Sequence, residues 1–252
     1  MTSLSGHGLR IQQFAPLRLL SKWNRVSFGL SSCPRPAWTA KRLNSSITNL
    51  NYPEPTTTNH HDLASFVDYA ERSGLDPKST LYVGTHYEYL VAQVLSQYGF
   101  YLRRIGGHSD YGTDLLGTWT VPSSKVPLRV LVQCKAIARK SAPNLIRELE
   151  GAFVGAPVGW RGHGVLGVFV TEKPATKGVR DSLSRSRWPM GFVSCTRDGR
   201  VQQMLWNQRA EEEGLGGMGV GMRHAGEQGQ SQLLLTWKGQ HIAIAEGSKP
   251  GS

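Results

Sequence analysis

Between Glu88 and Lys135 the sequence places two acids, an amide and an amine that could act together on a phosphodiester. Asp114 follows a glycine-rich turn, and Gln133 and Lys135 stand two residues apart in an otherwise apolar run. Mg²⁺ prefers one or two carboxylates and several waters to a full protein cage. A cation bound in this way polarises a phosphoryl oxygen and holds the attacking water. We therefore expect Asp114 to bind Mg²⁺ or Mn²⁺, and Lys135 to orient or deprotonate the water or to neutralise charge on the phosphoryl oxygens.

The remaining metal ligands should be hard oxygen atoms close to Asp114. The side-chain carbonyl of Gln133 or the backbone carbonyl of Cys134 can supply one, and Glu88 can bind the metal directly or through water. Each residue also has an ordinary explanation. Asp114 could be only a turn residue, and Glu88 only a surface charge on a helix. Gln133 and Lys135 could lie on a solvated strand face, although the run around them is apolar for an edge.

These side chains need a helix and three strands to hold them. On the second helix Glu88 lies beside the apolar, inward face, where a carboxylate needs a reason. On the third strand Gln133 and Lys135 point to the same side, about 7 Å apart along the strand. The predicted elements of this half are helices over 61–73 and from about 79 or 85 to 98, and strands over 100–105, 113–120 and 129–136.

The second half of the chain completes an α/β fold. The uninterrupted apolar run over 164–171 is typical of a strand buried on both faces. The order α-β-β-β-α-β predicts an α/β sandwich, a mixed β-sheet flanked by helices on both sides. Residues 214–229 are rich in glycine and are expected to form a mobile loop. The other predicted elements are helices over 144–154 and 175–186 and strands over 192–196, 201–207 and 233–237.

The N-terminal segment has the composition of a targeting signal. Residues 1–46 are rich in Arg, Ser and Leu and contain no Asp or Glu, which is typical of a mitochondrial transit peptide. The alternative is a disordered basic tail that binds nucleic acid or anionic lipid; the large apolar residues among the arginines favour the transit peptide. The predicted organisation is a transit peptide over 1–46, a linker and short helix over 47–78, the main domain over 79–213, a glycine-rich loop over 214–230, and a final strand and loose tail over 231–252.

Charge and cysteine usage narrow the function classes only slightly. The net charge is +11, but residues 1–53 hold seven of the 29 Lys and Arg and no acid. The rest carries 22 basic and 18 acidic side chains, a balance that allows a polyanionic partner without demanding one. Three scattered cysteines without C-x-x-C spacing predict neither a zinc site nor a disulfide framework, which fits a reducing compartment. No apolar run approaches the roughly 20 residues of a membrane-spanning helix.

Three basic residues are candidates for contacts with a nucleic-acid backbone. Arg103 and Arg104 lie near the end of the first predicted strand, and Lys140 follows the third strand. Salt bridges to phosphates would explain them. A solvated surface is the commoner explanation for each of the three.

Four motifs in this order resemble a known enzyme superfamily. They are Gly84-x-x-x-Glu88, Gly106-Gly107-x-x-Asp110-x-Gly112-x-Asp114-Leu115, Val132-Gln133-Cys134-Lys135 and Ile146-Arg147-Glu148-Leu149-Glu150-Gly151. The set resembles the Mrr-type branch of the PD-(D/E)XK restriction-endonuclease-like superfamily, over about residues 79–207. With the presequence, the whole chain resembles the fungal mitochondrial "required for respiratory growth" protein 7 family, which carries such a domain.

The resemblance implies a metal-dependent DNA endonuclease fold in the mitochondrion, in its matrix. By motif position Asp114, Gln133 and Lys135 take the catalytic motif, and Glu88 takes the helix acid. Gln133 stands where many superfamily members have Glu or Asp, which is usual in the Mrr branch and removes one charge from the metal site. The expected function is Mg²⁺-dependent hydrolysis of mitochondrial DNA in its maintenance or turnover. Restriction-type enzymes often act as homodimers. The alternative is an inactive nuclease fold that binds nucleic acid or serves as a scaffold.

Overall fold

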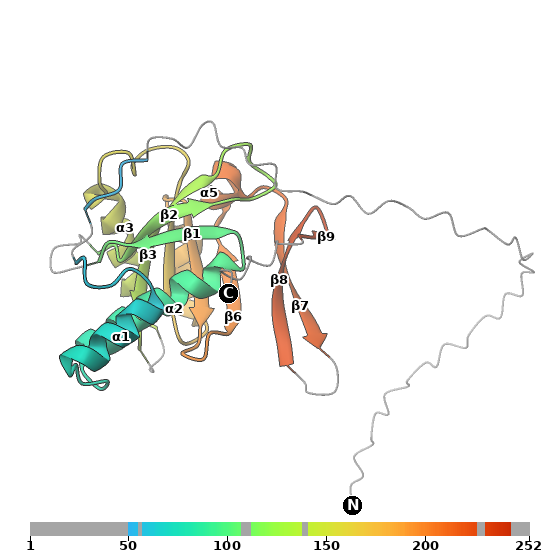
Figure 1. Cartoon of the computed structure of the whole chain (residues 1–252). Helices are drawn as coiled ribbons and strands as arrows, with labels where there is room; N and C mark the ends of the chain where they lie inside the picture. The colour runs from blue at the N-terminus through green and yellow to red at the C-terminus, as the bar shows by residue number, and fades with distance from the viewer. Residues whose placement is uncertain (1–49, 55–56, 107–111, 138–140, 226–229, 243–252) are drawn as a thin grey trace, which may run out of the picture. The chain divides into compact units, whose positions relative to one another are not determined.

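A six-stranded mixed sheet is the centre of the structure, a computed structural model that describes residues 50–54, 57–106, 112–137, 141–225 and 230–242 (Figure 1). The strands lie in chain order from β1 to β6. Strands β3, β4 and β5 are parallel to one another, whereas β1–β2, β2–β3 and β5–β6 are antiparallel pairs. The strands are β1 (Phe100–Arg104), β2 (Leu115–Trp119), β3 (Leu128–Lys135), β4 (Val165–Thr171), β5 (Met190–Cys195) and β6 (Val201–Trp206).

Helices cover both faces of this sheet, as the order of predicted elements indicates. Figure 1 shows α1 and α2 on one side and α3 on the other. Among the described residues, no helix is both long and apolar enough to cross a membrane. The helices are α1 (Leu63–Ser73), α2 (Thr80–Ser96), α3 (Asn144–Gly155), α4 (Lys177–Arg185) and the short α5 (Gln208–Ala210), which continues into the π-helical turn η1 (Glu211–Leu215).

Alternating side chains of the strands divide the core into two clusters. Leu115 of β2 and Val132 of β3 face α2 and pack with its Tyr87, Val91 and Leu95. The residues that alternate with these in each strand face the opposite side of the sheet. There Leu116 of β2 and Leu131 of β3 pack with the apolar stripe of α3. Strand β4 is buried along its whole length, as its uninterrupted apolar run predicts. The predicted α/β sandwich with a mixed sheet is confirmed.

The glycine-rich segment forms a strand, so the loop predicted over 214–230 is wrong. Strand β7 (Met218–Ala225) pairs antiparallel with β8 (Gln230–Trp237), and β8 pairs with the short β9 (Gln240–His241). Glycines alternate with larger residues in β7. The two-residue period of a strand is therefore present in the sequence, but the high glycine content conceals it. The hairpin joins the core because Leu233 and Leu235, each 2% exposed, pack in the α2-side cluster. Strand β8 starts at Gln230, earlier than the final strand predicted over 233–237.

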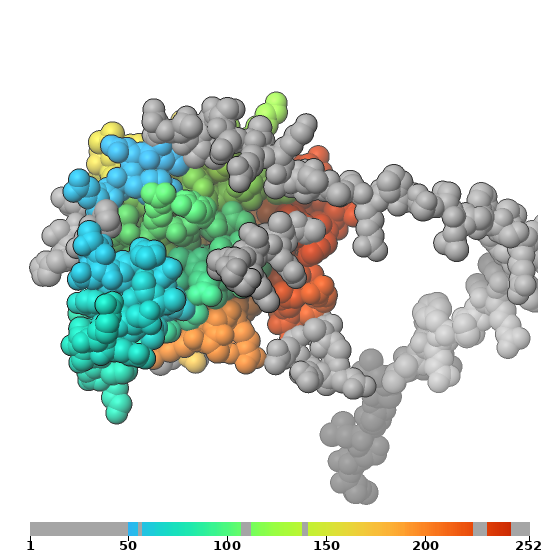
Figure 2. Space-filling model, viewed as in Figure 1, coloured from blue at the N-terminus to red at the C-terminus, as the bar shows by residue number. Residues whose placement is uncertain are grey.

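The segment before α1 belongs to the fold, so the prediction that it is a linker is also wrong. We call residues 50–54 and 57–61 the N-terminal strap; in Figure 2 its blue atoms lie against yellow and green surfaces of the domain. The indole Nε1 of the fully buried Trp160 donates a hydrogen bond of 3.0 Å to the carbonyl of Asn51. The Tyr52 ring packs edge-on against the same indole, with the two ring centroids 5.1 Å apart. The predicted transit peptide over 1–46 and the predicted tail beyond residue 242 lie outside the described residues.

Gly117 allows the close pairing of β1 with β2, and a side chain there should disrupt it. A Cβ at Gly117 would lie 1.9 Å from the carbonyl oxygen of Tyr101, whereas one at Gly151, inside α3, would meet nothing within 4 Å. We expect Gly117→Ala to lower the free energy of unfolding by about 1–3 kcal/mol or more. Gly151→Ala, the matched control, should raise it by about 0.5–1 kcal/mol, because alanine favours a helix.

Urea unfolding monitored by circular dichroism measures both changes. Equal unfolding midpoints for the two alanine variants would contradict this account of the β1–β2 contact.

Candidate functional site

Asp114 lies just before β2 and is bonded to the strands on both sides. Its N–H donates to the carbonyl of Val132 at 2.9 Å. Its own carbonyl accepts from the N–H groups of Ile105 and Gly106, both at 2.9 Å. Two successive donors on one acceptor form the hydrogen-bond pattern of a β-bulge, a feature that often occurs beside active sites. The carboxylate Oδ2 accepts from the Cys134 N–H at 2.6 Å, so main-chain bonds fix the position of this acid.

Gln133 and Lys135 extend from the end of β3 to the α3 side of the sheet. By the alternation of strand residues they lie on the same face as Leu131, and Asp114 lies on the same face as Leu116. The structure therefore brings Asp114, Gln133 and Lys135 to one end of the sheet.

The carbonyl oxygen of Gln133 suits a hard cation. Gln133 is 5% exposed, and its Oε1 has no hydrogen-bond partner among the described residues. A buried acceptor of this kind requires a water or an ion, and amide carbonyls are normal ligands for hard divalent cations. Gly112 borders the same amide, since a Cβ there would lie 3.6 Å from Gln133 Nε2. The positive φ of Gly112, 79°, also favours glycine.

Glu88 reaches the same end of the sheet from α2, but it is bound to an arginine. Its Oε2 lies 2.5 Å from Arg104 Nε, and the two side chains are 14% and 12% exposed. A Cβ at Gly106 would lie 3.4 Å both from Glu88 Oε2 and from the Asp114 carbonyl oxygen. Glu88 is therefore adjacent to the Asp114 backbone, and the helix acid predicted from the sequence is in place. This ion pair engages the guanidinium of Arg104, and the contact with nucleic acid predicted for this residue stays a prediction.

The thiol of Cys134 responds to the charges of this site. Burial raises its pKa well above the usual range, and the negative charges of Asp114 and then Glu88 raise it further, while Lys135 opposes them. The thiol is therefore protonated at neutral pH. Among the described residues, no group of three His, Cys, Asp or Glu side chains could hold a metal. A metal here would depend on Asp114, amide or backbone carbonyls, and water.

A buried hydroxyl extends the site along the ends of the parallel strands. Thr171 ends β4, stands beside Lys135 in the β3–β4 register, and is fully buried. Its Oγ1 has no hydrogen-bond partner in the described part of the chain. In open α/β sheets, ligands bind at the carboxyl ends of strands. The sequence prediction missed Thr171, and its one available signal was a hydroxyl residue at the end of a wholly apolar strand.

Of the other two residues predicted to contact nucleic acid, Arg103 lies in the described part of the structure and Lys140 does not. Arg103 is exposed on β1, as a contact with nucleic acid requires, and its guanidinium carbon lies 4.6 Å from the centre of the Tyr52 ring. Lys140, the third predicted contact, lies outside the described residues, as does Asp110 of the glycine-rich motif.

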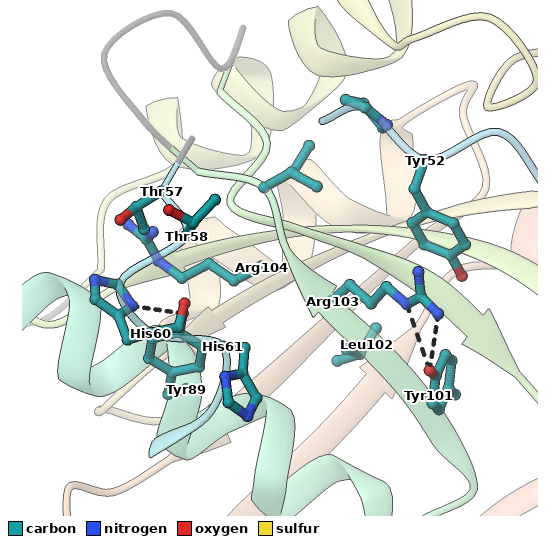
Figure 3. A pocket seen from close by; sticks show the side chains of 12 residues that line it. Tyr52, Thr57, Thr58, His60, His61, Tyr89, Tyr101, Leu102, Arg103 and Arg104 are labelled. Carbon is teal, nitrogen blue, oxygen red and sulfur yellow. Dashed lines mark hydrogen bonds between the residues drawn. The ribbon is translucent and has the colours of Figure 1, made fainter. Parts of the chain in front are cut away.

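Beside the site, a cavity of about 570 Å³ runs between β1 and the N-terminal strap (Figure 3). One of its walls is a histidine–tyrosine pair, formed by His60, which the sequence prediction assigned to a linker, and Tyr89 of α2. His60 Nδ1 lies 2.8 Å from the Tyr89 hydroxyl, which also donates to the His60 carbonyl at 3.2 Å. Burial, followed by the positive charges of Arg104 and His61, lowers the pKa of His60. His60 is therefore neutral at neutral pH.

Comparison with known proteins gives one family, one relative and one solved structure. The family model described as "Required for respiratory growth protein 7" matches residues 79–126 and 122–222. An uncharacterized mitochondrial protein of Schizosaccharomyces pombe is 31% identical over 155 residues, which are 60% of this chain and 61% of that protein. The chain thus matches about three fifths of this relative's length.

The solved structure is the MspJI restriction endonuclease in complex with a 27-mer oligonucleotide. It is 19% identical with a TM-score of 0.30, and the match covers 49% of this chain and 29% of that chain. A similarity of this size supports no conclusion about activity.

The lowered pKa of His60 predicts a loss of stability in mild acid. Because the folded-state pKa is below the unfolded value of about 6.5, the unfolded chain binds the proton more readily. The contribution of His60 is therefore fully present above about pH 6.5 and decreases as the pH falls toward its folded-state pKa. Melting temperatures between about pH 5 and pH 8 should fall less steeply on acidification in His60→Gln than in the unmodified protein. If the melting temperatures of the two proteins fell equally with pH, His60 would not be the source of the acid sensitivity.

Proposed function

Because the chain belongs to the "Required for respiratory growth protein 7" family, we propose that it is a metal-dependent nuclease that hydrolyses phosphodiesters of mitochondrial DNA. Family membership implies a role in mitochondrial respiratory growth. The matrix, which contains this DNA, is the compartment that we propose. The observation that carries the proposal is the buried Gln133 carbonyl without a donor among the described residues, on the same sheet face as Asp114 and Lys135.

The proposed metal ligands are oxygen atoms from two neighbouring strands. Asp114 supplies the carboxylate, Gln133 its side-chain carbonyl, and Cys134 its backbone carbonyl, with waters in the other positions. When bound, Mg²⁺ or Mn²⁺ would polarise a phosphoryl oxygen and lower the pKa of a coordinated water. The Cys134 N–H, 2.6 Å from Asp114 Oδ2, keeps the carboxylate in the orientation that such binding needs.

Lys135 and Glu88 have separate parts in this mechanism. In this proposal the Lys135 amine donates hydrogen bonds to a phosphoryl oxygen or to the attacking water, which stabilises the charge that develops there. Glu88 is held by Arg104, so in this proposal it acts through water instead of binding the metal directly.

The proposal predicts loss of cleavage when Asp114 or Lys135 is changed. Asp114→Asn keeps the shape and the acceptor oxygen for Cys134 but removes the metal-binding charge, and Lys135→Met keeps most of the stem. Each should lower the rate of oligonucleotide cleavage in Mg²⁺ or Mn²⁺ by at least about a hundredfold. Arg187→Gln, which removes an exposed charge between α4 and β5, is the matched control and should cleave normally.

Several DNA and RNA substrates, with and without a chelator, make this test decisive. Intact substrates after long incubation of the unmodified protein, or equal cleavage by the Asp114→Asn variant, would refute the nuclease.

One observation favours a second function, a non-catalytic nucleic-acid-binding or scaffold protein. Glu88 is bound to Arg104 and Gln133 is uncharged, so the metal site that we propose relies on the charge of one carboxylate, that of Asp114. Such a site binds a divalent cation weakly, and the fold could be kept for another purpose.

Respiratory growth separates the two functions. If the protein is a nuclease, cells that carry only Asp114→Asn should fail to grow on a respiratory carbon source although the protein level is normal. Growth equal to that of cells with the unmodified gene would support the scaffold. A rise in melting temperature with Mg²⁺ that is lost in Asp114→Asn gives an independent measurement of metal binding.

A further inference from the structure

The cavity beside β1 lies along an edge of the sheet that is free for a ligand. Strand β1 is the first in the strand order, so among the described strands only β2 pairs with it. The N-terminal strap forms the opposite wall and leaves about 570 Å³ between them. Ligand pockets of proteins commonly enclose about 300–1,000 Å³. The space is therefore large enough for one small organic group.

The lining of this cavity is aromatic and cationic. None of the described residues that line it is Asp or Glu. Arg103 lies between two rings, with its guanidinium carbon 4.6 Å from the centre of Tyr52 and 5.6 Å from that of Tyr101. Figure 3 shows this arrangement, with Arg103 donating to the Tyr101 hydroxyl. Tyr101 is 57% exposed, so its ring is accessible to a planar group.

Arg103 is the residue of this lining that can bind an anion. It makes no ion pair with a carboxylate of the described chain, whereas the charge of Arg104 is balanced by Glu88. Figure 3 shows Arg104 extending away from Arg103, toward His60 and Tyr89. His60 is neutral for the reasons given above, and its ring is hydrogen-bonded to Tyr89. A planar group with a negative charge matches this end of the cavity, and a nucleotide has both parts.

Two residues that line the cavity also contact residues of the proposed catalytic site. Ile105 lines it, and the Ile105 N–H donates to the carbonyl of Asp114. Arg104 lines it as well and binds Glu88 on the other side. A nucleic-acid strand that lies across Asp114 would therefore bring its neighbouring nucleotide to this opening.

We propose that the cavity binds one unpaired nucleotide of a nucleic-acid strand, with a phosphate on Arg103 and the base against the Tyr52 and Tyr101 rings. Stacking on aromatic rings recognises bases of any sequence, and a cavity of this size admits one base but not a base pair within a helix. The subsite would direct the protein to single-stranded or frayed substrates. This inference rests on the proposed function and specifies which substrate the nuclease takes.

Binding without a divalent cation tests the subsite apart from catalysis. Fluorescence anisotropy of the full chain in a chelator would use three labelled probes of equal length: oligothymidine, oligouridine and a DNA duplex. We expect tighter binding of the single strands than of the duplex. Tyr101→Ala should weaken single-strand binding about fivefold or more, whereas Tyr101→Phe, which keeps the ring, should retain it.

Arg103→Gln should weaken the same binding and reduce the slope of log K against log salt by about 0.7, the value for one phosphate contact on a single strand. The matched control Arg187→Gln should leave both unchanged. Since Tyr101 and Arg103 are exposed, these variants should keep the melting temperature of the unmodified protein. A preference for RNA or DNA among the single strands identifies the natural strand.

Equal binding of duplex and single strands, or equal effects of Arg103→Gln and Arg187→Gln, would overturn the subsite. Failure of the nuclease gives a different result, because the unmodified protein would then cleave nothing while single-strand binding still depended on Tyr101 and Arg103.

Discussion

The position of Asp114 depends on hydrogen bonds to the strands on either side of it. Its amide and carboxylate bind β3, and its carbonyl holds the bulge that ends β1. A metal ligand is useful only if its position is fixed to a fraction of an ångström, and here main-chain groups fix it instead of flexible side chains. Through these bonds the end of β1 and the end of β3 are both tied to Asp114.

The strands that position Asp114, Gln133 and Lys135 could be predicted because their signal is local. Alternation in β2 and β3 places Asp114 with Leu116 and Gln133 with Leu131, and both apolar residues lie in the α3-side cluster. The helix that carries Glu88 was predictable from its apolar stripe in the same way. A period of two or 3.6 residues needs no knowledge of distant contacts. For this reason the sheet, its flanking helices and the end of the sheet that carries the site agree with the sequence pattern.

The parts that could not be predicted depend on contacts between distant residues. Helical projection shows that Glu88 is near the inward face, but it does not reveal that Arg104 of β1 neutralises it. The strap has a polar, turn-like composition, and only the buried indole of Trp160, more than a hundred residues later, makes it part of the fold. Strand β7 was hidden because glycine contributes nothing to an alternating apolar pattern, and its partner β8 supplies the buried leucines.

The contact between the strap and Trp160 sets a limit on maturation of the protein. Leu50 and Tyr52 cover the α3-side cluster, and the Asn51 carbonyl accepts the Trp160 indole N–H. A peptidase that removes an import signal must therefore cut before Leu50 if the mature N-terminus is to keep this covering. A later cut would expose the indole to water and also remove the Tyr52 ring from Arg103. If the predicted import signal is removed, the position of the cut would therefore affect both the packing of the α3-side cluster and the shape of the cavity on β1.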